Sequence, residues 1–203
     1  NLAADPDNRL HWRFNRTRLD AESIRDSLLM IAGTLDSRPQ SQPYPFPARD
    51  KWTFTQHHPF KDDYPSHKRS VYLLTKRLTA KSYFQTFDGP DPNVCTSRRD
   101  QSVTALQALF FVNDQFLHEQ SEHFAEKLIN RSADVNSRIR IAVRTILARS
   151  PTVEESTILA GHLSAVKKRL GVNPEITDAE LERQAWASLT RSLFRLNEFL
   201  YLD

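Results

Sequence analysis

Apolar side chains recur every three or four residues over residues 16–35, a spacing typical of an amphipathic helix. Asp20 is placed to cap the first free N–H groups of this helix, with Leu19 and Ile24 in the positions of a hydrophobic staple. Gly33 supplies a left-handed stop. The pattern therefore predicts one helix between Asp20 and Gly33.

The predicted helix is apolar on more than one side, so we expect it to lie centrally in the fold. One face carries Ile24, Leu28 and Ile31, while Leu29 and Met30 point away from that face. Before the helix, apolar and polar residues alternate, which predicts a short extended segment lying on the core. Its apolar members are Leu10, Trp12 and Phe14.

The chain then changes character, because residues 36–67 are rich in proline and aromatic residues. The run PYPFP at residues 43–47 fits neither a helix interior nor a central strand. Disordered segments are poor in aromatic residues, so we expect an ordered, irregular wrap over the helices. Residues 68–77 can form helix or strand, and we favour helix. Residues 82–95 read as a turn-rich connection that pivots at Gly89.

The last hundred residues predict helices from local start signals. Three capping boxes are expected, at Thr104/Gln107, Thr152/Glu155 and Thr177/Glu180. Periodic apolar residues predict further helices from residue 114 and over residues 135–149, and Gly171 can end the helix that begins at Thr152. The class is therefore mainly α. We expect a single compact helical domain over residues 1–203, with about five to seven helices and the 36–67 excursion.

Composition excludes several classes of protein. The net charge of +3 is diffuse, and no nucleic-acid-binding signature appears. No apolar run is long enough for a membrane span, and no signal peptide is present. Cys95 is the single cysteine, so we expect it to be a small buried residue rather than a metal or disulfide site. Because the chain begins at Asn1, we expect a fragment of a longer multidomain protein.

Four separated motifs resemble one family: RTRLDAESIRDSLLMIAGTLD, KRSVYLLTKR, FDGPDPNVCTSRRDQSVTALQALFFVND and the closing NEFLYLD. It is the C-terminal Planctomycete-specific domain of unknown function, and the resemblance covers residues 8–203. The resemblance implies an extracytoplasmic location, periplasmic or at the cell surface. It also implies a large exported parent protein that often carries a cytochrome-c-like haem domain. It supplies no activity and no catalytic residues. The family's glycine pair after LD is replaced here by Ser37-Arg38-Pro39, and Ala105 stands where a proline is usual before LQAL.

Glu22 and Asp26 are the first candidate site, because carboxylates at i,i+4 lie on one helix face and can share a proton, a metal or a sugar hydroxyl. The alternative is a structural network of arginines and carboxylates. We favour the network, because 20 of the 28 basic residues are arginines and buried charges normally persist only when paired. Its expected members are Arg18, Asp20, Arg25, Arg69, Arg77, Arg98 and Arg99, with Arg18 and Arg25 within reach of Glu22.

Further binding candidates are Asp88 and Asp91 at the FDGPD turn, and Tyr44, Trp52 and Tyr64 in the excursion. The aromatic rings suit sugar stacking or a protein interface, although core packing is the interpretation we favour. The sequence HEQSEH spaces its histidines i,i+5, unlike the i,i+4 zinc pair of HExxH. His57, His58 and His67 lie near Asp62 and Asp63, but with irregular spacing. We therefore expect no metal site, no cofactor and no catalytic residue in this chain.

Three hypotheses follow. The one we favour is a non-catalytic extracytoplasmic module that binds other domains of the parent protein, or a polysaccharide or protein, through residues 44–64. A second is a carbohydrate-active enzyme using Glu22 and Asp26 or Asp88 and Asp91. A third is a docking domain for a haem-bearing domain of the same parent.

Overall fold

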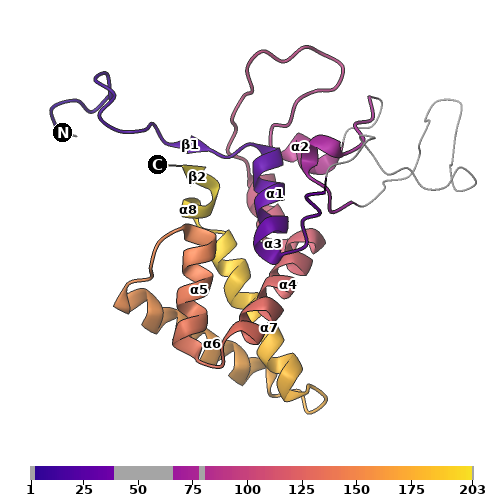
Figure 1. The fold of residues 1–203 in the computed structure, drawn as a ribbon, viewed down its shortest axis with the longest axis vertical. Coiled ribbons are helices and arrows are strands. Elements are labelled where there is room, and N and C mark those ends of the chain that lie inside the picture. The colour runs from indigo at the N-terminus through magenta and orange to yellow at the C-terminus, as the bar shows by residue number, and fades with distance from the viewer. Residues whose placement is uncertain (1–2, 39–65, 78–80, 203) are drawn as a thin grey trace, which may run out of the picture. The chain divides into compact units, whose positions relative to one another are not determined.

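The chain is mainly α-helical in the computed structural model, as the sequence pattern predicts (Figure 1). The structure describes residues 3–38, 66–77 and 81–202. Within those ranges six helices are longer than two turns, and α2 and α8 are about one turn each. The elements are, in order, β1 (Thr17–Arg18), α1 (Ala21–Ala32), the 3-10 helix η2 (Ser70–Tyr72), α2 (Ser82–Thr86), α3 (Ala105–Asn113), α4 (Gln115–Arg131), α5 (Val135–Leu147), α6 (Val153–Leu170), α7 (Asp178–Phe194), α8 (Asn197–Leu200) and β2 (Tyr201–Leu202).

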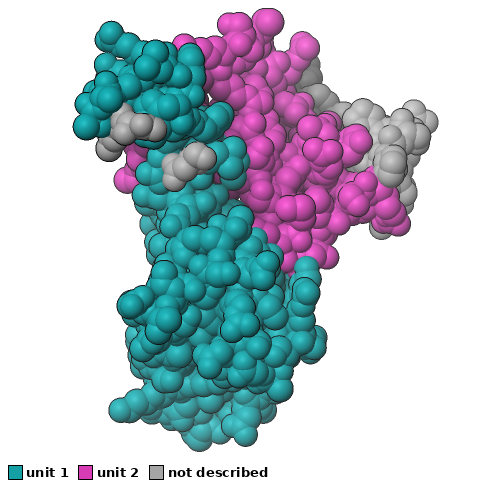
Figure 2. Space-filling view, turned by 60° about the vertical axis from the view of Figure 1, so that its left-hand side comes forward, with its two compact units in different colours: residues 1–19, 108–203 teal, residues 20–107 magenta. Residues whose placement is uncertain are grey.

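The chain divides into two compact units, which are described separately (Figure 2). The larger unit contains Asn1–Leu19 and Ala108–Asp203, and the smaller contains Asp20–Gln107. In sequence, the smaller unit is therefore inserted between two parts of the larger one. That the whole chain is one domain stays a prediction.

The larger unit is a helical bundle in which α7 packs along α4 and α6, and α5 contacts α4, α6 and α7. Apolar faces at helical spacing form its core, which includes Phe124, Leu128, Ile139, Trp186 and Leu189, all at most 2% exposed. The Trp186 indole nitrogen donates to a Glu182 carboxylate oxygen at 2.8 Å. The same oxygen accepts from Arg138 at 2.7 Å, so a buried ring and a buried cation share one carboxylate.

A short antiparallel ladder closes the larger unit. Thr17 pairs with Leu202 and Arg18 with Tyr201. The Leu19 N–H extends the ladder by donating to the Leu200 carbonyl at 2.8 Å. The first and last described segments of the chain are thus held together by backbone hydrogen bonds.

The smaller unit is organised around α1, which packs against η2 and α2. Both predicted caps of α1 are confirmed. The Asp20 side chain accepts from the Ser23 N–H at 2.7 Å, and Gly33 ends the helix with a left-handed φ of 82°. Ile24, Leu28 and Leu29 are fully buried, so burial does extend to more than one side, but Met30 is 61% exposed.

The start signals of the later helices are also confirmed. Thr152 and Glu155 form a complete capping box at α6. Thr104 and Gln107 bond reciprocally at 3.3 Å at the start of α3. At α7 only half of the predicted capping box forms, because the Thr177 hydroxyl accepts from the Glu180 N–H at 3.2 Å while the Glu180 carboxylate accepts from Arg183 and Gln184. The helix α6 ends at Leu170 as expected, but Gly171 has φ −67° and is right-handed, so its freedom is not what stops the helix.

The prediction that Leu10, Trp12 and Phe14 lie on the core is wrong. Leu10 is 81% exposed and Phe14 is 63% exposed. Local side-chain hydrogen bonds explain the difference, since such bonds compete with regular structure. Asp5 accepts from the Leu10 N–H at 2.8 Å, and Asn8 donates to the Arg13 carbonyl at 2.7 Å. The segment is therefore folded on itself by turns rather than extended.

Two other expectations need correction. The only helical element within residues 68–77 is the single 3-10 turn η2, so they do not form a helix along their length. In so short a segment, contacts with the rest of the chain decide the conformation more than periodicity does. Cys95 is exposed, not buried. Residues 82–95 form a turn-rich connection as predicted, although α2 occupies their start.

Candidate binding site on helix α1

Helix α1 places the two candidate carboxylates one turn apart, with Asp20 at the N-cap, Glu22 in the first turn and Asp26 in the second. The side chain of Glu22 is 22% exposed and that of Asp26 is 18% exposed. Each carboxylate has its own set of donors, so the contacts of the two are separate. The two carboxylates therefore do not form one shared site.

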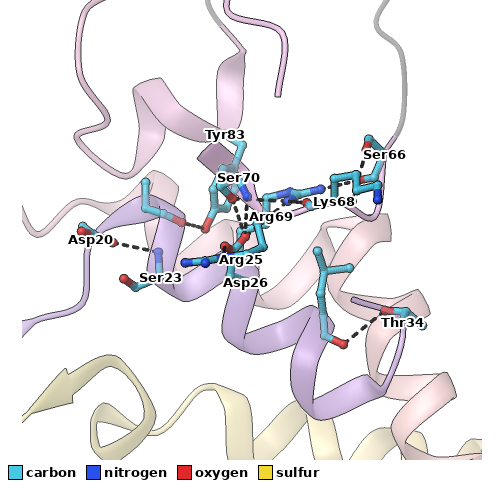
Figure 3. Close-up of polar contacts among 12 residues, drawn as sticks. Asp20, Ser23, Arg25, Asp26, Thr34, Ser66, Lys68, Arg69, Ser70 and Tyr83 are labelled. Carbon is cyan, nitrogen blue, oxygen red and sulfur yellow. Dashed lines mark hydrogen bonds and ion pairs between the residues drawn. The ribbon is translucent and has the colours of Figure 1, made fainter. Parts of the chain in front are cut away.

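Asp26 binds the first residue of η2 (Figure 3). Its Oδ1 atom accepts from the Ser70 N–H at 2.8 Å and from the Ser70 hydroxyl at 2.7 Å. Arg25 approaches the same oxygen at 3.5 Å, and Arg69 lies 3.7 Å from the other. Asp26 thus caps the start of η2 from the neighbouring helix.

Arg25 is buried and fastens the same segment from the other side (Figure 3). Its guanidinium donates to the Lys68 carbonyl at 2.9 Å, to the Ser66 carbonyl, and to the Ser70 hydroxyl at 3.3 Å. Burial lowers the pKa of Arg25, and the nearby Asp26 carboxylate partly offsets this. Charged hydrogen bonds to buried carbonyls are among the stronger ones, so Arg25 ties residues 66–70 to α1.

A backbone clasp lies next to this cluster. The Asp36 N–H donates to the His67 carbonyl at 2.9 Å, and Asp36 and Lys68 form a parallel bridge. The Lys68 ammonium lies 2.8 Å from the Asp36 carboxylate. Hydrogen bonds from Arg38 and Lys68 hold the pKa of Asp36 well below its usual range.

Glu22 pairs with an arginine far along the chain. Arg99 donates to its two carboxylate oxygens at 2.5 and 2.9 Å, which is the bidentate geometry that favours arginine over lysine. Asp20 lies 3.9 Å from the same guanidinium. The Glu22 carboxylate raises the pKa of Arg99. Residues 20–22 thus hold the segment around Arg99 against the start of α1.

The two aspartates of the FDGPD turn also bind their own surroundings. Asp88, with φ 57°, accepts from the Ser102 N–H at 2.9 Å and from the Ser102 hydroxyl at 2.7 Å. Asp91 accepts from the Asn93 N–H at 2.8 Å, the geometry of an Asx turn. Both contacts fix loop backbone.

The remaining predicted residues are dispersed. Arg18 is buried in β1, whereas Arg77 and Arg98 are exposed. Arg77 contributes its carbonyl, which accepts from the Asn93 amide at 3.0 Å. Tyr44, Trp52 and Tyr64 lie outside the described residues, as do His57, His58, Asp62 and Asp63. Among the described residues, no group of three His, Cys, Asp or Glu side chains is placed to hold a metal ion.

A hollow of about 70 Å³ lies beside Glu22, with Leu73, Lys81 and Phe84 among its lining residues. Ligand pockets for small organic molecules usually measure about 300–1,000 Å³. The hollow is too small to enclose a sugar ring. A carbohydrate would have to bind at this place on an open surface.

The HEQSEH segment does not gather its acids and histidines into one group. A ring nitrogen of His118 lies 3.0 Å from the Val112 carbonyl, and Glu119 accepts from Gln115 at 2.8 Å. Glu122 pairs with Arg183 of α7 at 2.6 Å. Glu122 and Arg183 therefore link α4 to α7.

Sequence reasoning missed an apolar stripe on α3. Leu106, Leu109 and Val112 recur at three-residue spacing and are 65%, 51% and 45% exposed. Val103, just before the helix, is 85% exposed. The available signal was the segment ALQALFFVN, which is apolar on almost every side. A helix of that kind is normally buried, so its exposed apolar face is unusual.

None of the described helices has the length and apolar character needed to cross a membrane. No curated protein and no solved structure matches the chain. A family model does match, over residues 1–163, and its description is "PSD1: Protein of unknown function (DUF1553)". This match covers most of the 203 residues and contains three of the four motifs, while NEFLYLD at residues 197–203 lies beyond it. The chain belongs to the PSD1 family of proteins of unknown function.

Proposed function

We propose that this chain is a non-catalytic interaction module of a larger exported protein, and that it docks onto another domain of its parent through α3. The observation that carries the proposal is the exposed stripe of Leu106, Leu109 and Val112. The multidomain, extracytoplasmic setting is what the family resemblance implies, and it belongs to the proposal.

Burying the exposed stripe against another protein surface is favourable, because it removes apolar side chains from water. Residues three apart on a helix are neighbours, so the stripe is contiguous apolar surface. Fully burying one Leu or Val side chain is worth about 1.5–3 kcal/mol, and these three are 45–65% exposed. A neighbouring domain of the same polypeptide is present at high effective concentration, so a modest apolar contact is enough for docking.

The contacts of the carboxylates favour a structural role for them over a catalytic one, which supports a non-catalytic module. Glu22 is engaged by Arg99 and Asp26 by Ser70, Arg25 and Arg69, while Asp88 holds Ser102. A general acid or base needs a proton that it can exchange with substrate. Groups committed to arginines and backbone N–H donors suit a structural role instead. The carbohydrate-active alternative rests on Glu22 and Asp26 being partly exposed, and Glu22→Gln tests it, since loss of a polysaccharide-cleaving activity would favour the enzyme.

The docking proposal is tested by photo-crosslinking in the full-length parent protein. A photoreactive residue at Leu109 should crosslink to another domain of the same polypeptide, and one at the exposed Glu126 of α4 should not. The domain captured, whether haem-bearing or not, is read by mass spectrometry. Equal crosslinking at both positions, or none at Leu109, would contradict docking through α3.

A charge substitution gives an independent check. The double variant Leu106→Glu, Leu109→Glu should lose the crosslink placed at Val112 while keeping its helical content, because both side chains are largely exposed. Ile158→Glu is the matched control, since it makes the same kind of change at a 69% exposed position of α6. If the control removes the crosslink equally, the effect is not specific to the stripe.

A further inference from the structure

A cleft of about 430 Å³ lies in the larger unit, lined by side chains of α4, α6 and α7. This volume is within the range of sites for small organic ligands. The lining residues are His118 and Glu122 from α4, Val166, Arg169 and Leu170 from α6, and Gln184, Ala187, Ser188 and Arg191 from α7. The positions on α7 run from Gln184 to Arg191, which is about 10 Å along the helix.

The key residue is Arg191, which is half-buried. Burial and the neighbouring Arg195 lower its pKa, and Glu122 partly offsets this. Glu122 itself is paired with Arg183 at 2.6 Å. Among the described residues, no carboxylate forms an ion pair with the Arg191 guanidinium. Its positive charge is therefore partly removed from water without a dedicated partner, which is unfavourable unless an anion is supplied.

The rest of the cleft adds a second cation and an apolar wall. Arg169 lines it and is likewise without an ion pair in the described part of the chain. Val166 and Leu170 offer apolar surface. Ser188 is already in contact with His162, at 3.2 Å. Positive charge and apolar surface therefore meet in one hollow of ligand size.

We propose that this cleft binds a small oxyanion, a carboxylate, phosphate or sulfate group carried on a compact organic body. The guanidinium of Arg191 donates to the anionic group, Arg169 contributes a second positive charge, and the side chains of Val166 and Leu170 contact the organic part. A guanidinium presents a planar fork of donors that matches two oxygens of such a group. This site lies on different helices from the α3 stripe and does not depend on the proposed docking function.

The alternative is that the two arginines are ordinary solvated cations. Both stand in the last turn of their helices, where the helix dipole stabilises positive charge. Arg144 stands in the last turn of α5, is exposed and does not line the cleft. Arg144→Gln therefore removes the same charge from an equivalent helix position and serves as the matched control.

The test titrates inorganic sulfate, inorganic phosphate and citrate separately into the complete chain at constant ionic strength. Backbone ¹H–¹⁵N resonances should shift with saturation by at least one of these anions, and the shifts should centre on residues 166–170 and 184–191. Arg191→Gln should weaken that anion at least tenfold and Arg169→Gln less, while Arg144→Gln should leave the affinity unchanged. Preference for citrate would indicate a carboxylate ligand, and preference for phosphate or sulfate a tetrahedral one.

The stability of Arg191→Gln shows whether lost binding could come from lost folding. Arg191→Gln removes a half-buried charge that has no ion-pair partner among the described residues, so without added anion its melting temperature should equal or exceed that of the original chain. Lost binding would then reflect lost recognition rather than lost structure. The proposal is overturned if none of the three anions saturates, or if Arg144→Gln weakens binding as much as Arg191→Gln does.

Discussion

Arg99 donates two hydrogen bonds to the carboxylate of Glu22, at 2.5 and 2.9 Å, across 77 positions of sequence. The side chains are 36% and 22% exposed, so solvent screens the pair. A double-mutant cycle with Glu22→Gln and Arg99→Gln should give a coupling energy of about 1 kcal/mol in denaturant unfolding. Arg99→Lys should lose part of it, because an ammonium cannot form the fork. Arg98→Gln, an exposed neighbouring change, is the control, and a coupling as large between Glu22 and Arg98 would refute the pairing.

Arg25 should be far more important to stability than its neighbour Arg69. Arg25→Met removes the guanidinium donor of the Ser66 and Lys68 carbonyls and leaves Asp26 without its nearest buried positive charge, which should cost about 3–5 kcal/mol. Amide exchange at Asp36 and Ser70 should accelerate in this variant, since both N–H groups donate within the fastened segment. Arg69→Met, at a side chain 57% exposed, should change stability by less than about 1 kcal/mol. Equal effects of the two substitutions would show that Arg25 does not anchor residues 66–70.

Acid should selectively weaken the junction of α5 and α6. Hydrogen bonds from Arg149 lower the pKa of Glu155 to about 2 from an ordinary value near 4.5. A depressed carboxyl pKa contributes stability that is present above pH 4.5 and is lost as pH falls towards 2. The melting temperatures of the original chain and Glu155→Gln should therefore differ at pH 6 and converge near pH 2. At neutral pH the free energies of unfolding of the two should differ by at most about 1 kcal/mol. Glu126→Gln should show no such convergence, and a pH-independent difference for Glu155→Gln would count against the pair.

Cys95 should react in the folded protein. Its exposure predicts rapid modification under native conditions by an aromatic disulfide that releases a yellow thiolate. The rate should be close to that in denaturant. Cys95→Ser should change the free energy of unfolding by less than about 0.5 kcal/mol and should abolish the reaction. Modification that requires denaturant would mean that the thiol is covered.

Helix boundaries were predictable because their signals act over a few residues. Asp20 and Ser23, Gly33 with its left-handed φ, and Thr152 with Glu155 each need only their own turn. The prediction for Phe14 failed because alternation carries no information on whether a second surface covers the apolar side. Asp5 and Asn8 fold that segment by hydrogen bonds that alternation does not register.

The sequence limited the possible arginine partners of Glu22 to a few residues but could not identify the one that binds it. Arg99 was among six arginines named as counter-ions, yet Arg18 and Arg25 were the ones expected near Glu22. Arg25 instead donates to the carbonyls of Ser66 and Lys68, which depends on where a segment 41 residues later passes. The exposure of α3 could not be predicted from the sequence either. A helix that is apolar on all sides predicts burial, but its sequence does not show which segment would cover it.

The packing of α7 on α4 and α6 limits where this chain can be truncated without loss of its core. The family match ends at residue 163, inside α6, while α7 begins at Asp178 and supplies the fully buried Trp186 and Leu189. A polypeptide stopped at residue 163 would lose α7, the helix that packs along α4, and would also lose β2, the partner of β1. The smallest autonomous folding piece of this chain therefore extends well past the family boundary, and recombinant expression should retain everything through Leu202.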